Sequence, residues 1–70
     1  MDNHLEPGSR CRATRPIPHK RGIVVRSSEG TVCSLRENIG RQLVTVEFDS
    51  GERLVLFAHE IEPLAAVSFD

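Results

Sequence analysis

The chain has 70 residues, with 9 Lys and Arg against 10 Asp and Glu, so its formal net charge is −1. This length allows one small domain, which excludes a two-domain enzyme and leaves little room for a catalytic cleft. No apolar run approaches the roughly 20 residues of a membrane helix, and the polar N-terminus lacks a signal-peptide core. We therefore expect a cytoplasmic protein that is not an enzyme and has no membrane partner.

The small net charge conceals an asymmetry along the chain. Residues 1–26 carry six basic and two acidic groups, a sum of +4, whereas residues 27–70 carry three basic and eight acidic groups, a sum of −5. Two interpretations stay open. The two parts neutralise each other on a solvated surface, or the fold separates them into a basic face and an acidic face.

The N-terminal third predicts a lead, a strand and a long loop. Residues 1–8 are expected to be a flexible lead that ends in a Pro-Gly turn. Residues 9–15 alternate, with Cys11 and Ala13 on one face, which predicts a strand. Residues 16–29 are predicted to be a long ordered loop, because their two prolines cannot donate to a sheet. Ile23, Val24 and Val25 are apolar enough to tuck one or two side chains under it.

The remaining residues predict four more strands. Residues 41–48 show the clearest alternation, with Val44, Val46 and Phe48 on one face and Leu43 on the other. The elements expected around this strand are a strand at 31–36, a turn at 37–40, a tight hairpin at 49–52, a strand at 53–57, a 3₁₀ turn at 58–61, a short strand at 62–66 and a tail at 67–70.

This order of elements is typical of a small five-stranded SH3-like β-barrel with a long first loop and a 3₁₀ turn before the last strand. The barrel is predicted to span residues 9–66. Closing the sheet removes edges that would otherwise pair with other chains. The predicted core consists of the large apolar residues on the inner faces: Val32, Leu35, Val44, Val46, Phe48, Leu54, Leu56, Ile61 and Leu64.

Three motifs between residues 29 and 64 carry a family resemblance. They are EGTV (29–32), LVTVEFDSGERLVLF (43–57) and HEIEPL (59–64). Their EG-x-V opening, V-x-F strand and acidic turn before a final strand resemble the SH3-like variable (alpha) chain of ferredoxin–thioredoxin reductase. The resemblance implies a chain without a cofactor that braces a larger redox or metal enzyme. The hairpin DSGE (49–52) is more similar to NifZ-like and KOW-like patterns, which have the same general order of strands and turns.

The cysteines and histidines give no pattern of a metal or catalytic site. Cys11 and Cys33 are too few for a disulfide scaffold, and a buried, reduced thiol is the expectation, with a disulfide or a reactive thiol as the alternative. His4, His19 and His59 lack metal-binding spacing with them, so we expect no metal and no cofactor. Cys33 with His59 is the only nominal pair of a nucleophile and a base.

The strand at 53–57 is apolar on both faces, which predicts a surface for docking a partner or for forming a dimer. If its leucines point inward, Val55 and Phe57 point outward and Leu43 joins them from the neighbouring strand. Arg10 and Arg12 would form a basic rim that orients the partner. We therefore expect a non-catalytic protein-interaction module, an accessory or regulatory subunit of a larger intracellular enzyme. The alternative is that the 16–29 loop folds over this surface with Ile23 and Val25 and covers it.

A KOW-like module that binds RNA or the ribosome is the second functional hypothesis. Its phosphate contacts would come from basic residues of the N-terminal third: Arg12, Arg15, Lys20, Arg21 and Arg26. The sequence pI of about 6.3 and the absence of Tyr and Trp for base stacking argue against it, and a solvated arginine face is the alternative. The missing Tyr and Trp also exclude a groove for Pro-rich peptides and a methyl-lysine cage.

Overall fold

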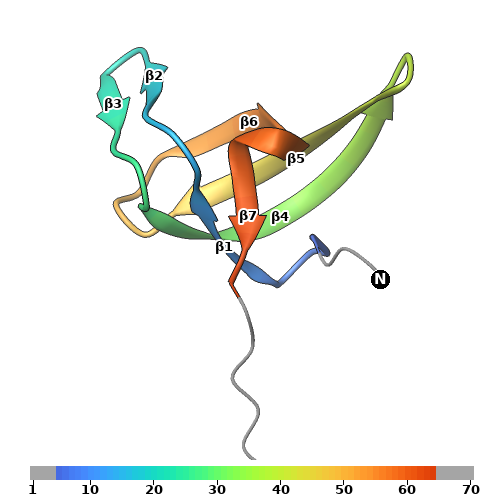
Figure 1. Cartoon of the computed structure of the whole chain (residues 1–70), viewed down its shortest axis with the longest axis horizontal. Helices are drawn as coiled ribbons and strands as arrows, with labels where there is room; N and C mark the ends of the chain where they lie inside the picture. Colours follow the sequence, from blue (N-terminus) through green and yellow to red (C-terminus); the bar gives the residue numbers. More distant parts are fainter. Residues whose placement is uncertain (1–4, 65–70) are drawn as a thin grey trace, which may run out of the picture.

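The computed structural model describes residues 5–64, which form an all-β fold and confirm the predicted class (Figure 1). The elements in chain order are β1 (Arg10–Ala13), β2 (Ile17–His19), β3 (Gly22–Val24), β4 (Glu29–Asn38), β5 (Arg41–Phe48), β6 (Arg53–Phe57), the 3₁₀ turn η1 (Ala58–Glu60) and β7 (Ile61–Pro63). In Figure 1, β4 and β5 form a long curved ribbon, and the β2–β3 hairpin projects near one end of it.

Five strands form one antiparallel sheet in the order β6-β5-β4-β1-β7. Within residues 5–64 no strand pairing joins β6 to β7, so the sheet is not closed by hydrogen bonds. The strands β2 and β3 form a separate two-stranded sheet. The sheet therefore has two edges, which differ in length and composition.

The strands in the centre of the sheet follow the sequence pattern closely. The bounds of β5 and β6 agree with the predicted strands at 41–48 and 53–57. The strand β4 is longer than predicted, because its first residues pair with β1 and its last residues continue to pair with β5. Only Ile39 and Gly40 connect β4 to β5. Both have positive φ, 49° and 79°, as a type I′ hairpin turn requires.

The last strand is displaced from its predicted position. The turn η1 ends at Glu60, and β7 covers Ile61–Pro63, whereas a strand was predicted at 62–66. The strand begins earlier because Ile61 pairs with Ala13 of β1 and is buried. Residues 65–66 and the predicted tail at 67–70 lie outside the described residues.

The predicted long loop at 16–29 contains a hairpin, which the sequence analysis missed. Ile17 pairs with Val24, and both side chains are buried in the main core. Pro16 and Pro18 made a strand unlikely from the sequence, because proline has no N–H to donate to a neighbouring strand. In a two-stranded sheet, however, each strand has one edge without a neighbour, and a proline N facing that edge loses no hydrogen bond. Ile23 and Val25 are exposed, at 60% and 64%, so Val24 is the residue of this apolar run that the fold buries.

The core lies on the inner face of the sheet and under the β2–β3 hairpin. Six of the nine predicted core residues are buried: Val32, Val44, Val46, Phe48, Leu56 and Ile61. Leu35 and Leu54 are partly buried and pack against this core. Cys11, Ala13, Ile17 and Val24 complete it. The predicted burial of Cys11 is therefore confirmed.

The described part of the N-terminal lead is attached to β4. The predicted Pro-Gly turn is present, with Gly8 at φ 94° and the Ser9 N–H donating to the Glu6 carbonyl (2.9 Å). The Gly8 N–H donates to the Val32 carbonyl (2.8 Å). Gly8 is therefore hydrogen-bonded to the sheet, and residues 1–4 lie outside the described residues.

Candidate protein-docking surface

The strand register brings the three predicted docking residues together on the outer face of β5 and β6. Leu43 lies directly opposite Phe57, and Val55 lies opposite Thr45, one row further along the two strands. Val55 is 53% exposed and Phe57 38% exposed, while Leu43 is half-buried. We call Leu43, Val55 and Phe57 the outer patch.

The alternative that the 16–29 segment covers this patch is wrong. Ile23 and Val25, the two residues proposed to cover it, are themselves among the exposed apolar residues of the chain. The segment instead places Ile17 and Val24 into the core. The outer patch therefore stays accessible in the part of the chain that the structure describes.

Two further side chains extend the outer patch, and the sequence analysis missed their role. The Phe57 ring is stacked nearly parallel to the His59 ring, with centroids 5.8 Å apart. The Arg41 guanidinium carbon lies 5.6 Å from the Phe57 ring centroid, which is a cation–π contact. Together with Gln42 and Ala58, these residues line a shallow hollow. The position of Arg41 could have been predicted from the sequence, because it lies two residues before Leu43 in the same strand and therefore on the same face.

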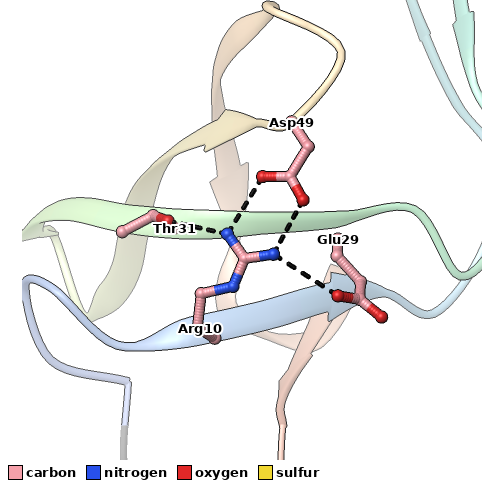
Figure 2. A network of polar contacts seen from close by, with 4 residues as sticks. All are labelled: Arg10, Glu29, Thr31 and Asp49. Carbon is pink, nitrogen blue, oxygen red and sulfur yellow. Dashed lines mark hydrogen bonds and ion pairs between the residues drawn. The ribbon is translucent and has the colours of Figure 1, made fainter.

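The proposed basic rim does not lie beside the outer patch. Arg10 and Arg12 are on β1, which β4 and β5 separate from β6. Figure 2 shows that Arg10 makes two hydrogen bonds to the Asp49 carboxylate (2.9 and 2.7 Å) and contacts Glu29 and Thr31 (3.3 and 3.0 Å). This network ties β1 to the start of β4 and to the turn after β5.

The charges of these two arginines are balanced within the molecule. The hydrogen bonds from Arg10 lower the pKa of the Asp49 carboxyl, and those bonds raise the pKa of the Arg10 guanidinium. The Arg12 guanidinium is paired with the Glu62 carboxylate on β7. Attraction between the basic N-terminal third and the acidic remainder therefore operates at β1, which supports the interpretation of intramolecular neutralisation.

The other basic residues of the RNA hypothesis remain on the surface without ion pairs among residues 5–64. This group consists of Arg15, Lys20, Arg21 and Arg26. Lys20 and Arg21 form the turn of the β2–β3 hairpin and, with His19, face the turn between β5 and β6. A hydrogen bond from Ser50 lowers the pKa of Glu52 in that turn, and the charges of His19 and Arg21 lower it further.

The thiols and histidines are arranged as separate groups. Cys11 and Cys33 are both free thiols, and burial raises the pKa of Cys11. The Cys33 thiol donates to the Thr31 carbonyl (3.8 Å), while His59 stacks on Phe57. Among residues 5–64 there is no group of three His, Cys, Asp or Glu side chains that could hold a metal ion.

No family model, curated protein or solved structure matches this chain. Within residues 5–64, none of the helical segments is long and apolar enough to span a bilayer.

Proposed function

We propose that the chain is a non-catalytic protein-interaction module, an accessory or regulatory subunit that docks on a larger protein through the outer patch. The observation that carries this proposal is the pair of exposed apolar side chains, Val55 and Phe57, beside Leu43 on one sheet face. An apolar centre with Arg41 and His59 at its border has the composition of an interface core, where aromatic residues and arginine are enriched.

The fold proposed for this module is an SH3-like barrel. The strand order is consistent with it, since β1, the first strand of the sheet, lies between β4 and the last strand, β7, and a 3₁₀ turn precedes β7. The β2–β3 hairpin occupies the position of the long first loop. The resemblance to the variable chain of ferredoxin–thioredoxin reductase suggests a redox or metal enzyme as the partner.

The proposal is tested by affinity capture from the native cell with wild-type protein and two variants. Phe57→Ser removes the aromatic centre of the patch, and we expect it to release a stoichiometric protein partner. Ile23→Ser removes an apolar side chain that is exposed away from the patch, and we expect it to retain that partner. Circular dichroism verifies that both variants are folded. A partner that is retained equally by both variants would contradict docking through the outer patch.

An RNA-binding module is the second candidate, and the unpaired cations at the β2–β3 turn favour it. Lys20→Ala is expected to weaken RNA binding and to reduce the salt dependence by about one counterion per lost phosphate contact. Arg12→Ala is expected to have a smaller effect, because Glu62 already neutralises Arg12. Affinity for RNA that does not change with salt or with Lys20→Ala would contradict this candidate.

A further inference from the structure

The outer face of the five-stranded sheet has one end at which the arginines are paired. There Arg53 lies on the strand next to Glu47, directly opposite it, and forms an ion pair with it (3.4 Å). At the same end Arg10 forms ion pairs with Glu29 and Asp49, at 3.3 and 2.7 Å (Figure 2). These carboxylates are therefore engaged within the molecule.

The other end of the outer face carries two arginines without ion pairs. Arg36 lies directly opposite Leu43, and Arg41 lies two residues before Leu43 on β5, so both are on the face of the outer patch. Both side chains are exposed, and neither forms an ion pair within residues 5–64. Such diagonal neighbours on antiparallel strands are roughly 7–8 Å apart, so the fold places two positive charges side by side.

Two carboxylates also belong to this end of the sheet, but neither is paired with these arginines. Glu37 lies opposite Gln42, so it has the phase of the other sheet face. The Glu60 carboxylate accepts a hydrogen bond from the Phe57 N–H (3.0 Å). Neither carboxylate forms an ion pair in the described part of the chain. The guanidinium groups of the outer patch are therefore open to a carboxylate from another molecule.

The Arg41 guanidinium is held in place by an aromatic ring. Its carbon lies 5.6 Å from the Phe57 ring centroid, and the Phe57 ring is itself stacked on His59. A cation–π contact uses none of the guanidinium N–H groups. Those groups form a planar fork that binds a carboxylate by two parallel hydrogen bonds. Because the ring already restricts Arg41, a carboxylate that binds here immobilises little additional side-chain freedom.

We propose that the outer patch binds an extended segment of the partner protein in which a glutamate or aspartate is two residues from an apolar side chain. This inference rests on the proposed function, because it specifies what that surface binds. The carboxylate binds Arg41, with Arg36 beside it, and the apolar side chain covers Leu43 and Phe57. Successive rows of the outer face are two residues apart along β5, and side chains on one face of an extended segment have the same repeat.

The charge pattern favours a short acidic segment over a nucleic-acid backbone. A nucleic acid carries a phosphate at every nucleotide and needs cations along its whole path. On this face the unpaired cations lie at one end, Leu43 and Val55 occupy the middle, and Glu47 lies at the other end. A continuous phosphate chain would meet apolar side chains and then a carboxylate. A segment with one acidic and one apolar residue meets a complementary group in each row.

Selection from a random-peptide display library on the purified wild-type chain tests the chemistry of the occupant. We expect enrichment of peptides that carry a carboxylate two residues from an apolar side chain and that lose binding to Phe57→Ser. Peptides that require Phe57 but are neutral or basic would overturn this inference and leave docking through the outer patch intact. A selection without any peptide that requires Phe57, or single-stranded RNA bound there instead, would also overturn it. Whether the patch docks a partner at all is decided separately, by the capture experiment.

A double-mutant cycle between Arg41 and the carboxylate of a selected peptide tests the contact itself. Fluorescence anisotropy measures the peptide Kd, and we expect Arg41→Gln to raise it about fivefold. With glutamine in place of the peptide carboxylate, we expect Arg41→Gln to have no further effect. The cycle cancels any change that the lost cation–π contact causes at Phe57, because both peptides meet it equally.

The matched control for this cycle is Arg15→Gln. It removes the same charge from an exposed position between β1 and β2. We expect it to leave the peptide Kd within about twofold of wild type, because charges separated by more than a Debye length are screened. Equal losses in Arg15→Gln and Arg41→Gln would show an effect of net charge alone and overturn the contact, as would losses in the cycle that simply add.

Discussion

Gly30 on β4 lies very close to the backbone of β5, and this close approach yields a quantitative prediction for Gly30→Ala. A Cβ atom built on Gly30 would lie 2.6 Å from the Glu47 carbonyl oxygen and 2.9 Å from the Phe48 Cα. Both are backbone atoms of the paired strand, so neither can move aside by a change of rotamer. The strand β4 must shift away from β5, and Gly30 also pairs with Cys11 of β1.

The expected loss follows from two opposing contributions. Overpacking of this kind costs up to about 3 kcal/mol, and alanine recovers up to about 1 kcal/mol by restricting the unfolded chain. The net destabilisation is therefore about 2 kcal/mol, or a fall in Tm of about 8–16 °C for a domain of this size. Urea unfolding followed by circular dichroism measures it. Ser34→Ala, at an exposed position of the same strand, should change stability by less than about 0.5 kcal/mol. A Gly30→Ala variant as stable as Ser34→Ala would refute the argument from close approach.

Three further predictions concern acid, the β4–β5 turn and the thiols. In the folded protein the pKa of the Asp49 carboxyl lies below its ordinary value, so the pairing with Arg10 stabilises the fold at pH values above that ordinary pKa, and this contribution is lost as the pH falls through the lowered pKa. Urea unfolding should therefore show wild type and Asp49→Asn differing in stability at neutral pH and converging in strong acid. A stability difference that does not change with pH would contradict this. Ile39 is a β-branched residue at φ 49°, where such residues are strained, and its side chain is 94% exposed and contributes little to packing. Ile39→Asn should therefore stabilise the fold by about 1 kcal/mol, and a variant with a lower Tm than wild type would refute the strain at this position. A thiol reagent should label Cys33 in the folded protein and Cys11 only after unfolding, and equal rates at neutral pH would contradict the burial of Cys11.

The central hairpin of the fold was predictable because its sequence alternates without interruption. In β5, Val44, Val46 and Phe48 have the same phase, and all three are buried. Any one-residue slip would move all of these side chains to the outer face, so the alternation determines the register as well as the strand. The outer patch was predictable for the same reason, since Leu43 has the opposite phase.

The elements that the sequence did not predict depend on contacts between distant segments. The two prolines of the 16–29 segment disfavour a strand locally, yet burial of Ile17 and Val24 on the main core outweighs that preference. Likewise, Arg41 and His59 are ordinary surface residues in the sequence. They contact Phe57 only because the β5–β6 register brings Arg41 near the Phe57 ring and the turn η1 stacks His59 on it.

The described part of the fold divides the arginines of the chain into those that form ion pairs and those that do not. The four ion pairs within residues 5–64 use Arg10, Arg12 and Arg53. They join β1 to β7, to the start of β4 and to the turn after β5, and they join the end of β5 to the start of β6. Arg41, whose guanidinium lies over the Phe57 ring, forms no ion pair within residues 5–64. A residue pair that folding neutralises cannot orient a partner strongly, whereas an unpaired guanidinium beside an apolar surface can. This contrast supports the proposed docking at the Arg41 end of β5 and β6, where exposed apolar side chains lie beside a guanidinium that forms no ion pair within residues 5–64.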